Sequence, residues 1–305
     1  MTQRIISGYS DDAGGRDALA LGVVLADLAG DAELTVARAY SYNPPTAIGS
    51  PASGWRLTLR DRAEAELRPA RAAFGTRPRT SFVACCGVSP TDGLHRLADE
   101  LAATAIVVGG SHDHGLGRVR VGGVTEQTLH GAPCAVAVAA AGYADRAGAR
   151  IGRVAVAFNG SAESRRALAA GTQIARDAGA RLTILGAVGE AAVWYGAYAG
   201  DDAATVRGVV RDELDAAAAG LTGLSDVRVE VLGGDPAGAI AEASAGEDLL
   251  VLGSRGYGPL RRVLLGSVSS RLVRDAACGV LVVPRTAVRA PGDEAAASEP
   301  AAATA

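Results

Sequence analysis

One segment near the carboxyl end of the chain gathers glycine, serine and arginine in a spacing that suits an anion. The apolar run 249–252 is followed by Gly253-Ser254-Arg255-Gly256 and, after nine further residues, by Gly266-Ser267-Val268. Between positions 253 and 274 there are five arginines and no acidic residue, although the whole chain has a net charge of −3. Glycine lets a backbone approach a ligand closely, and a helix that begins at Ser267 would present free N–H groups and a positive dipole end. We therefore expect a phosphate-bearing ligand there.

The segments around this loop have the pattern of a parallel sheet. Short apolar runs, typical of strands buried on both faces, alternate with helix-length segments. In the second half of the chain we expect strands near 153–158, 181–188, 226–232, 249–253 and 279–283, and helices near 162–178, 202–219, 236–245 and 267–276. In the first half we expect strands near 4–8, 34–40, 81–86, 105–109 and 134–138. The pattern predicts an α/β fold.

The chain also repeats itself at a spacing of about 145 to 149 residues. The run 106–109 matches 250–253, for example, and 132–134 matches 276–278. We predict two tandem domains, at 1–140 and 151–286, joined by a linker at 141–150. Residues 287–305 are rich in Ala, Pro and Glu, and we expect them to form a disordered tail.

The composition argues against several classes of function. All 30 basic residues are Arg, so the chain has no lysine for a phosphate-binding P-loop or a Schiff base. An aromatic content of 4% without a basic face does not suggest nucleic acid as a partner. No apolar run approaches the roughly 20 residues of a membrane span, and the amino terminus does not resemble a signal peptide, so we expect a cytoplasmic protein without a membrane partner.

We expect no catalytic residue and no metal site. The chain has no nucleophile elbow, no Gly-x-Gly-x-x-Gly after either first strand, and no carboxylate pair beside the glycine loop. The loop His112-Asp113-His114 lacks further metal ligands, so we interpret it as a polar loop. The four cysteines lie in or beside apolar runs and lack metal-site spacing, which predicts reduced, buried thiols. The aromatic residues of the loop 189–200 either cover a ligand or pack within their own loop; they are Trp194, Tyr195 and Tyr198.

The glycine spacing after a buried strand, Gly-x2-Gly-x9-Gly-Ser, resembles the nucleotide-binding signature of the universal stress protein family. The resemblance covers nearly all of both halves. It implies two tandem Rossmann-like domains of the adenine nucleotide alpha hydrolase-like type, each with a five-stranded parallel sheet of order 3-2-1-4-5 and helices on both faces. It also implies that ATP, alone or with Mg²⁺, binds between strands 1 and 4, where the strand order reverses.

The resemblance places the nucleotide on ten residues of the second half. Gly253 and Gly256 would face the ribose and phosphates, and Arg255 would add charge. The segment 266–268 would hold the phosphates through backbone N–H groups and a hydroxyl, while the backbone near Ala187 would recognise adenine. The full set is Asn159, Gly160, Ala187, Gly253, Ser254, Arg255, Gly256, Gly266, Ser267 and Val268.

The chain departs from the family pattern in both halves. The family's first strand ends in Asp-Gly-Ser, but here Asn159 replaces the acid, which we expect to weaken its nucleotide contact by about 1 kcal/mol. In the first half His112 replaces the second glycine, and Gly122-Gly123 replaces Gly-Ser. We therefore predict that the second half binds nucleotide more tightly than the first.

These features together predict an ATP-binding, non-enzymatic stress-response module that signals nucleotide occupancy to an unidentified protein partner. The last strands of the two halves can pair within one chain and form an intramolecular pseudo-dimer, and a homodimer stays open. Two alternatives remain: a weak ATPase or nucleotidyl-transferring enzyme, and a nucleotide-free scaffold.

Overall fold

The computed structural model describes residues 2–43, 52–110, 123–146, 148, 150–189, 203–254 and 265–284. Its strands are β1 (Arg4–Gly8), β2 (Glu33–Ser41), β3 (Thr80–Gly87), β4 (Ala105–Gly109), β5 (Ala135–Ala139), β6 (Arg153–Ala157), β7 (Arg181–Val188), β8 (Val227–Gly233), β9 (Leu249–Gly253) and β10 (Gly279–Val283). Its helices are α1 (Ala13–Leu28), α2 (Ala52–Glu66), α3 (Arg68–Phe74), α4 (Pro90–Leu101), α5 (Gly123–Leu129), α6 (Ala162–Ala178), α8 (Ala203–Ala219), α9 (Pro236–Ala243) and α10 (Ser267–Asp275).

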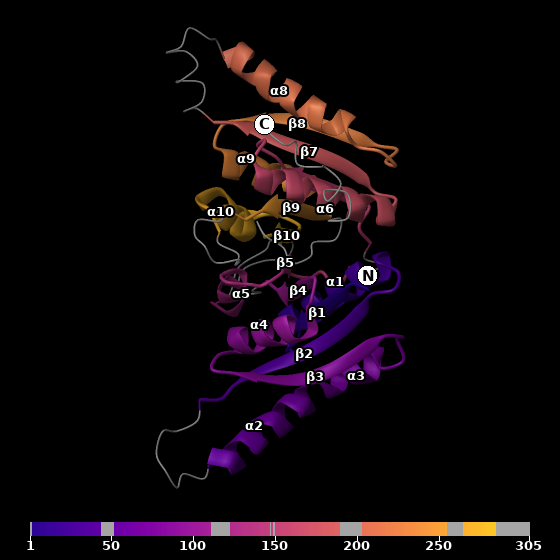
Figure 1. The fold of residues 1–305 in the computed structure, drawn as a ribbon, viewed down its shortest axis with the longest axis vertical. Helices are drawn as coiled ribbons and strands as arrows, with labels where there is room; N and C mark the ends of the chain where they lie inside the picture. Colours follow the sequence, from indigo (N-terminus) through magenta and orange to yellow (C-terminus); the bar gives the residue numbers. More distant parts are fainter. Residues whose placement is uncertain are drawn as a thin grey trace, which may run out of the picture.

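All ten strands of the described part of the chain belong to one sheet, in the order β3-β2-β1-β4-β5-β10-β9-β6-β7-β8 (Figure 1). Within each half the neighbouring strands are parallel, and their order is third, second, first, fourth, fifth. The expected α/β class and strand order are confirmed. Each strand lies within one residue of its expected ends, because buried apolar runs bounded by turns mark strands clearly.

Polar residues at the strand-to-helix turns fix where several helices begin. Asp12, Ser89, Ser161 and Asp235 each accept a hydrogen bond from a first-turn amide of the following helix, at 2.7, 3.1, 3.2 and 3.0 Å. These caps satisfy N–H groups that have no partner within the helix. At its other end, α6 stops at Gly179, whose φ of +59° is a left-handed conformation that glycine adopts without strain.

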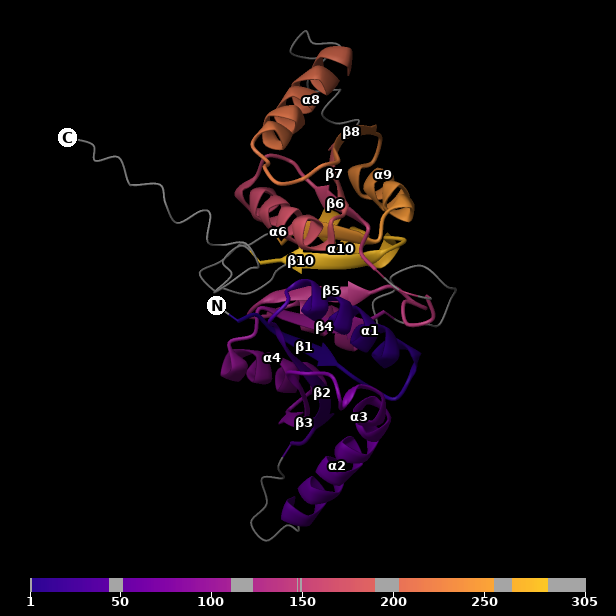
Figure 2. The same cartoon turned by 90° about the vertical axis from the view of Figure 1, so that its right-hand side faces the viewer.

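Each face of the sheet carries a hydrophobic core that runs through both halves. Alternation along β1 sends Ile5 into one core and Ile6 into the other, and Leu249 and Leu250 of β9 divide in the same way. The first core contains residues of α1, α3, α6 and α8, and the second contains residues of α4, α5, α9 and α10. The cores therefore divide by face of the sheet and not by repeat. The sheet itself continues from one half into the other, where β5 and β10 lie side by side (Figure 2).

The pairing of β5 with β10 joins the two halves. These strands are antiparallel, Ala137 lies opposite Leu281, and every residue of both strands is buried. The final strands thus pair within one chain, as the sequence analysis expected. Because both strands are covered on both faces, neither half can present this edge to solvent without exposing apolar surface.

The segment after β5 packs into the protein through a buried carboxylate. Asp17 of α1 is 1% exposed and accepts hydrogen bonds from the amides of Gly142 and Ala144, at 2.8 and 2.7 Å. Tyr143 between them is 2% exposed. The first part of the expected linker is therefore held against α1.

The four cysteines are free thiols. Cys85, Cys134 and Cys278 are buried, as predicted, whereas Cys86 is half-buried. Burial raises the pKa of Cys134 and of Cys278 to about 12, so both thiols stay protonated at neutral pH. The prediction of complete burial is wrong for Cys86, whose strand lies at the edge of the sheet, and the reduced state stays a prediction.

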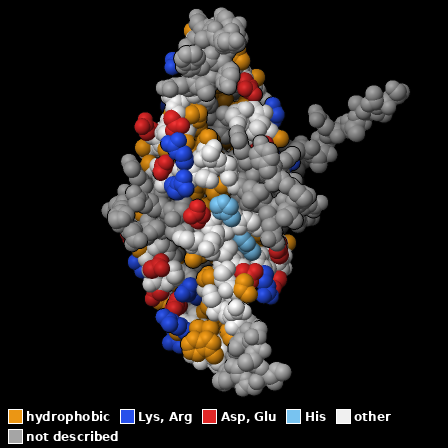
Figure 3. All heavy atoms as spheres, turned by 90° about the vertical axis from the view of Figure 1, so that its left-hand side faces the viewer, with side chains coloured by type: hydrophobic (Ala, Val, Ile, Leu, Met, Phe, Trp, Pro, Cys, Tyr) orange, Lys and Arg blue, Asp and Glu red, His pale blue; other side chains and the backbone are white. Residues whose placement is uncertain are grey.

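Charge is mixed over the described surface. Arginine and acidic side chains lie interspersed on the face in Figure 3. The described ion pairs include Arg4 with Glu33 and Arg153 with Asp248, both at 3.0 Å. Binding to a nucleic acid backbone commonly uses a face of one sign. None of the described helices is long and apolar enough to span a bilayer.

Removing the Asp17 carboxylate should destabilise the fold. Asp17→Ala leaves two amides of the following segment without their acceptor, so we expect the free energy of unfolding to fall by about 2–4 kcal/mol in urea titrations. Asp212→Ala, an exposed site on α8, is the control and should change it by less than about 0.5 kcal/mol. Equal stability of the two variants would contradict the anchoring role of Asp17.

Candidate functional site

The strand order reverses at two places in the sheet. β1 pairs with β2 on one side and β4 on the other, and β6 pairs likewise with β7 and β9. We call these places the first and second switch points. Loops that leave adjacent strands toward opposite faces open a crevice at the carboxyl ends of the strands, where ligands of open α/β sheets bind.

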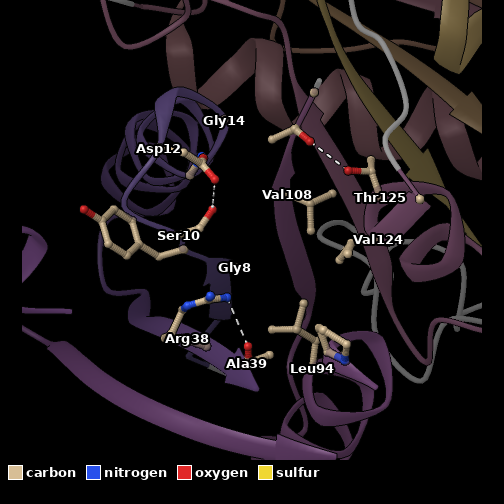
Figure 4. A pocket seen from close by; sticks show the side chains of 17 residues that line it. Gly8, Ser10, Asp12, Gly14, Arg38, Ala39, Leu94, Val108, Val124 and Thr125 are labelled. Atoms are coloured by element: carbon tan, nitrogen blue, oxygen red, sulfur yellow. Dashed lines mark hydrogen bonds between the residues drawn. The ribbon is translucent and has the colours of Figure 1, made fainter. Parts of the chain in front are cut away.

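A cleft of about 300 Å³ lies at the first switch point (Figure 4). The carboxyl ends of β1, β2 and β4 and the starts of α1, α4 and α5 line it. Ser10 and Asp12 lie on one wall, Thr125 and Val124 lie on the opposite wall, and Arg38 comes from β2 (Figure 4). The cleft has a volume at the lower end of the range of about 300–1,000 Å³ that is typical of small-molecule sites.

The internal repeat relates this cleft to the residues predicted for the second half. Ser10, Ala39, Gly109, Gly110, Gly123 and Val124 line the cleft and correspond, in that order, to Asn159, Ala187, Gly253, Ser254, Ser267 and Val268. The contacts repeat as well: the Thr125 hydroxyl donates to the carbonyl of Gly109 at 2.8 Å, and the Ser269 hydroxyl donates to that of Gly253 at 3.2 Å. Six of the ten predicted residues therefore occupy positions whose counterparts line a cleft.

The start of α10 differs from that of most neighbouring helices because its amides lack a side-chain cap. Gly266 is the N-cap residue, no side chain of the described residues accepts a hydrogen bond there, and the first turn contains no acid. By contrast, Ser161 caps α6 and Glu163 lies in its first turn. At α10 the free N–H groups and the positive end of the helix dipole are left for an anion.

Gly253 is held close to the first turn of α6. A Cβ atom at this position would lie 2.6 Å from the carbonyl oxygen of Glu163, a contact that no side chain tolerates without movement of the backbone. The repeat has the same requirement, since a Cβ at Gly109 would lie 2.0 Å from the carbonyl oxygen of Gly14. Gly253 and Gly109 are therefore required by packing, whether or not a ligand binds beside them.

The side-chain oxygens of Asn159 and Ser254 are less available to a ligand than we expected from the sequence. The side-chain oxygen of Asn159 accepts hydrogen bonds from the amide and hydroxyl of Ser161, at 3.3 and 2.7 Å, so its own loop occupies this acceptor. Ser254 is 1% exposed, and its hydroxyl has no partner among the described residues. Asn159 retains its NH₂ group as a donor at the surface, whereas the hydroxyl of Ser254 points into the protein interior.

Gly160 occupies a turn that requires glycine, whereas Ala187 lies in a strand. Gly160 has a φ of +72°, and a Cβ there would collide with the carboxylate of Glu213 from α8. Ala187 is half-buried near the end of β7, opposite Leu232 of β8. The backbone of β7 thus ends beside the second switch point, as the adenine assignment requires.

Asp12 gives the first switch point a carboxylate that is absent from the matching position of the second. Partial burial alone would raise the pKa of Asp12, but hydrogen bonds from the Gly15 amide and the Ser10 hydroxyl, together with Arg38 and Arg16, hold this pKa below its usual value. Asp12 is therefore ionised in the cleft at neutral pH. Its counterpart in the second half is the uncharged Ser161.

Several polar residues of the cleft are not among the predicted site residues. Asp12 and Thr125 are two of them, although Thr125 and Ser269 share a repeat position sixteen residues after a strand-ending glycine, which is a detectable signal. Arg38 was also missed: its guanidinium donates to the carboxylate of Glu66 and to the carbonyl of Ala39. Glycine stands at the matching position in the second half, so the repeat gave no signal for Arg38.

Several predicted residues lie outside the described part of the chain. They are Arg255, Gly256, Arg261 and Arg262 of the arginine-rich segment, the loop His112-Asp113-His114, the aromatics Trp194, Tyr195 and Tyr198, and the tail 287–305. Within the described residues, no group of three or more His, Cys, Asp or Glu side chains is arranged to hold a metal ion.

Comparison with known proteins gives the same two units as the repeat. The sequence profile of the universal stress protein family matches residues 1–140 and 150–284. A universal stress protein of Thermus aquaticus, named for the QAH/OAS sulfhydrylase 3′ region, is 35% identical over 130 residues, which are 42% of this chain and 95% of the relative.

Solved structures match over the whole sheet. The crystal structure of a universal stress protein from Archaeoglobus fulgidus covers 93% of this chain and 98% of its own, with a TM-score of 0.64 and 18% identity. A putative universal stress protein from Pseudomonas aeruginosa covers 93% of this chain and 94% of its own, with a TM-score of 0.60 and 18% identity. At this identity the likeness concerns the fold alone.

A single methyl group at Gly253 should disturb the second switch point. Because Gly253→Ala forces β9 and α6 apart, we expect the free energy of unfolding to fall by about 1–3 kcal/mol. Gly208→Ala is the control, since open space surrounds that position on α8 and alanine favours helix; stability should stay the same or rise by up to about 1 kcal/mol. Urea unfolding followed by circular dichroism measures both. An unchanged Gly253→Ala protein would show that the contact is looser than described.

Proposed function

Because the chain belongs to the universal stress protein family, we propose that it is an ATP-binding regulatory module that holds the nucleotide at the second switch point. The observation that carries the proposal is the cleft at the first switch point, whose walls include the repeat counterparts of six predicted nucleotide residues. A duplicated fold that keeps a cleft at this position in one copy supports a ligand site at the same position in the other.

The uncapped start of α10 would hold the phosphates. The amides of Ser267, Val268 and Ser269 belong to the first turn and have no partner within the helix. Arg271 and Arg274 add positive charge further along α10, although Arg271 also pairs with Asp235 at 2.8 Å. Both the dipole and the local charge therefore favour an anionic ligand.

The charges at the two switch points support tighter binding by the second half. In the first half the ionised Asp12 lines the cleft and Glu126 lies in the first turn of α5. In the second half Ser161 replaces Asp12, and the first turn of α10 has no acid. A triphosphate would be repelled by Asp12 and Glu126 of the first half and not by Ser161 and Ser270 at the same repeat positions, although the second half has Glu163 in the first turn of α6.

The ribose would be held by the NH₂ group of Asn159, because the oxygen of that side chain is already occupied within its loop. The amide would donate to a ribose hydroxyl, and the backbone at the end of β7 near Ala187 would recognise adenine. A neutral donor gives a weaker contact than a carboxylate acceptor, by about 1 kcal/mol.

The proposed role is binding without turnover. ATP, alone or with Mg²⁺, would favour one conformation of the chain, and a protein partner in the cytoplasm would recognise that conformation during stress. At the first switch point the Ser10 hydroxyl donates to the Asp12 carboxylate at 2.7 Å, whereas at the second the Ser161 hydroxyl donates to the neutral amide of Asn159. The uncapped amides and the arginines can bind a phosphate group, but they cannot act as the base that activates a water molecule for hydrolysis.

A matched pair of substitutions tests the site and the asymmetry together. Val268 at the start of α10 is 37% exposed, and its counterpart Val124 at the start of α5 is 46% exposed. A glutamate at Val268 stabilises the helix start but repels a phosphate, so we expect Val268→Glu to weaken ATP binding at least about tenfold in calorimetric titrations of the intact chain. Adenosine, which has no phosphate, should bind both Val268→Glu and the unchanged chain equally.

Val124→Glu is the matched control and should weaken ATP binding less than Val268→Glu does. A larger effect of Val124→Glu would contradict the assignment of the tighter site to the second half. Absence of any ATP binding to the unchanged chain, with no thermal shift at millimolar ATP, would favour the nucleotide-free scaffold. Turnover of ATP above background would favour the enzyme alternative.

A further inference from the structure

A groove runs along the free edge of β3, which is the edge strand at the opposite end of the sheet from β8. It has a volume of about 490 Å³, with α2 on one side and α4 on the other. Arg56 and Arg60 line it from α2, Arg96 lines it from α4, and Phe82 and Cys86 line it from the strand itself. Its lining shares no residue with the cleft at the first switch point, so the groove is a separate surface.

The backbone of β3 presents hydrogen-bonding groups to this groove. The carbonyls of Arg79, just before the strand, and of Gly87, its last residue, accept hydrogen bonds from the amides of Leu34 in β2 and of Tyr42 just after β2, each at 2.9 Å. In a parallel pair the backbone groups of successive residues point alternately toward and away from the partner strand. The N–H and C=O groups of Phe82, Ala84 and Cys86 therefore point away from β2, and no hydrogen bond among the described residues uses them.

The two edge strands of the sheet are protected differently. Proteins commonly blunt an exposed edge with charged residues, which discourage pairing with another chain. β8, at the opposite end of the sheet, carries the exposed Arg228 and Glu230. β3 has no charged residue and no proline along its 8 residues. The edge of β3 thus keeps the features of a strand that accepts a partner, whereas that of β8 does not.

The charges around the groove select the kind of partner. Arg56 and Arg60 lie one turn apart on α2, and neither forms an ion pair within the described residues. The two acids of the groove are already engaged, since Glu64 pairs with Arg71 at 3.4 Å and Glu100 lies 4.0 Å from Arg96. The groove therefore carries net positive charge on an overall acidic protein, which suits carboxylates.

We propose that an extended acidic peptide segment of a partner protein adds to the edge of β3 as a further strand. The outward groups of Phe82, Ala84 and Cys86 would form the backbone ladder, as in other cases of strand addition. Arg56 and Arg60 would pair with carboxylates that alternate along the peptide. This binding site is independent of the nucleotide proposal, because it uses a different surface of the first half.

A defined peptide tests the proposal on the intact chain. The probe is a fluorescent peptide of alternating valine and glutamate whose length matches the 8 residues of β3, and anisotropy at low ionic strength measures its binding. Saturable binding is expected, and a peptide with lysine in place of glutamate should bind at least about tenfold more weakly. The amides of Phe82, Ala84 and Cys86 should also exchange with deuterium more slowly when the glutamate peptide is bound.

Three substitutions separate strand addition from general attraction. Arg60→Glu should weaken binding at least about tenfold, whereas Arg207→Glu, on the α8 helix that flanks β8, should not change it. Ala84→Pro removes an outward N–H without loss of a bond to β2, and it should also weaken binding about tenfold or more. Val268→Glu should leave peptide binding unchanged, which keeps this test distinct from that of the nucleotide site.

Several outcomes would overturn the proposal. They are no binding of the glutamate peptide, equal binding of the lysine peptide, an unchanged affinity in Arg60→Glu, or unchanged exchange of the outward amides. A concentration-dependent dimer that Ala84→Pro abolishes would show instead that the edge pairs with a second copy of the chain.

Discussion

The antiparallel pairing of β5 with β10 is the contact on which the rest of the structure depends. It makes one sheet out of two repeats, and because both strands are fully buried, each hydrophobic core continues from one half into the other. The arrangement resolves a difficulty of the single repeat, which would leave an apolar edge exposed. It also places the two switch points on one continuous sheet. The buried Asp17 holds the segment between the halves through two hydrogen bonds.

Much of the fold follows from the sequence because its signals are local. Buried apolar runs mark the strands, and small polar caps such as Ser161 and Asp235 mark the helix starts. Because the same pattern of strands and helices occurs twice in tandem, it implies two sheets whose final strands can pair. The site was less predictable, since the orientation of Asn159 into its own loop and the burial of Ser254 depend on contacts between side chains. No spacing rule encodes those contacts, and likewise none encodes the reach of Arg38 into the cleft.

The two halves share a geometry but differ in chemistry. The first keeps a cleft at its switch point and carries Asp12 there, while the second replaces that carboxylate with Ser161 and leaves the start of α10 uncapped. Their outer edges differ as well, because β3 is uncharged and β8 is not. In the first half α4 lines both the cleft and the groove, with Leu94 at the cleft and Arg96 at the groove. The two repeats therefore share one fold, while substitutions have given them different residues at the switch points and at the outer edge strands.

The most direct test of the account is native mass spectrometry of the intact chain immediately after purification, followed by denaturation and identification of any small molecule released. If the second switch point holds an adenine nucleotide, the folded chain carries the mass of one such nucleotide, either as isolated or after incubation with ATP, and denaturation releases it. A folded chain that keeps its bare mass under both conditions would contradict the nucleotide assignment.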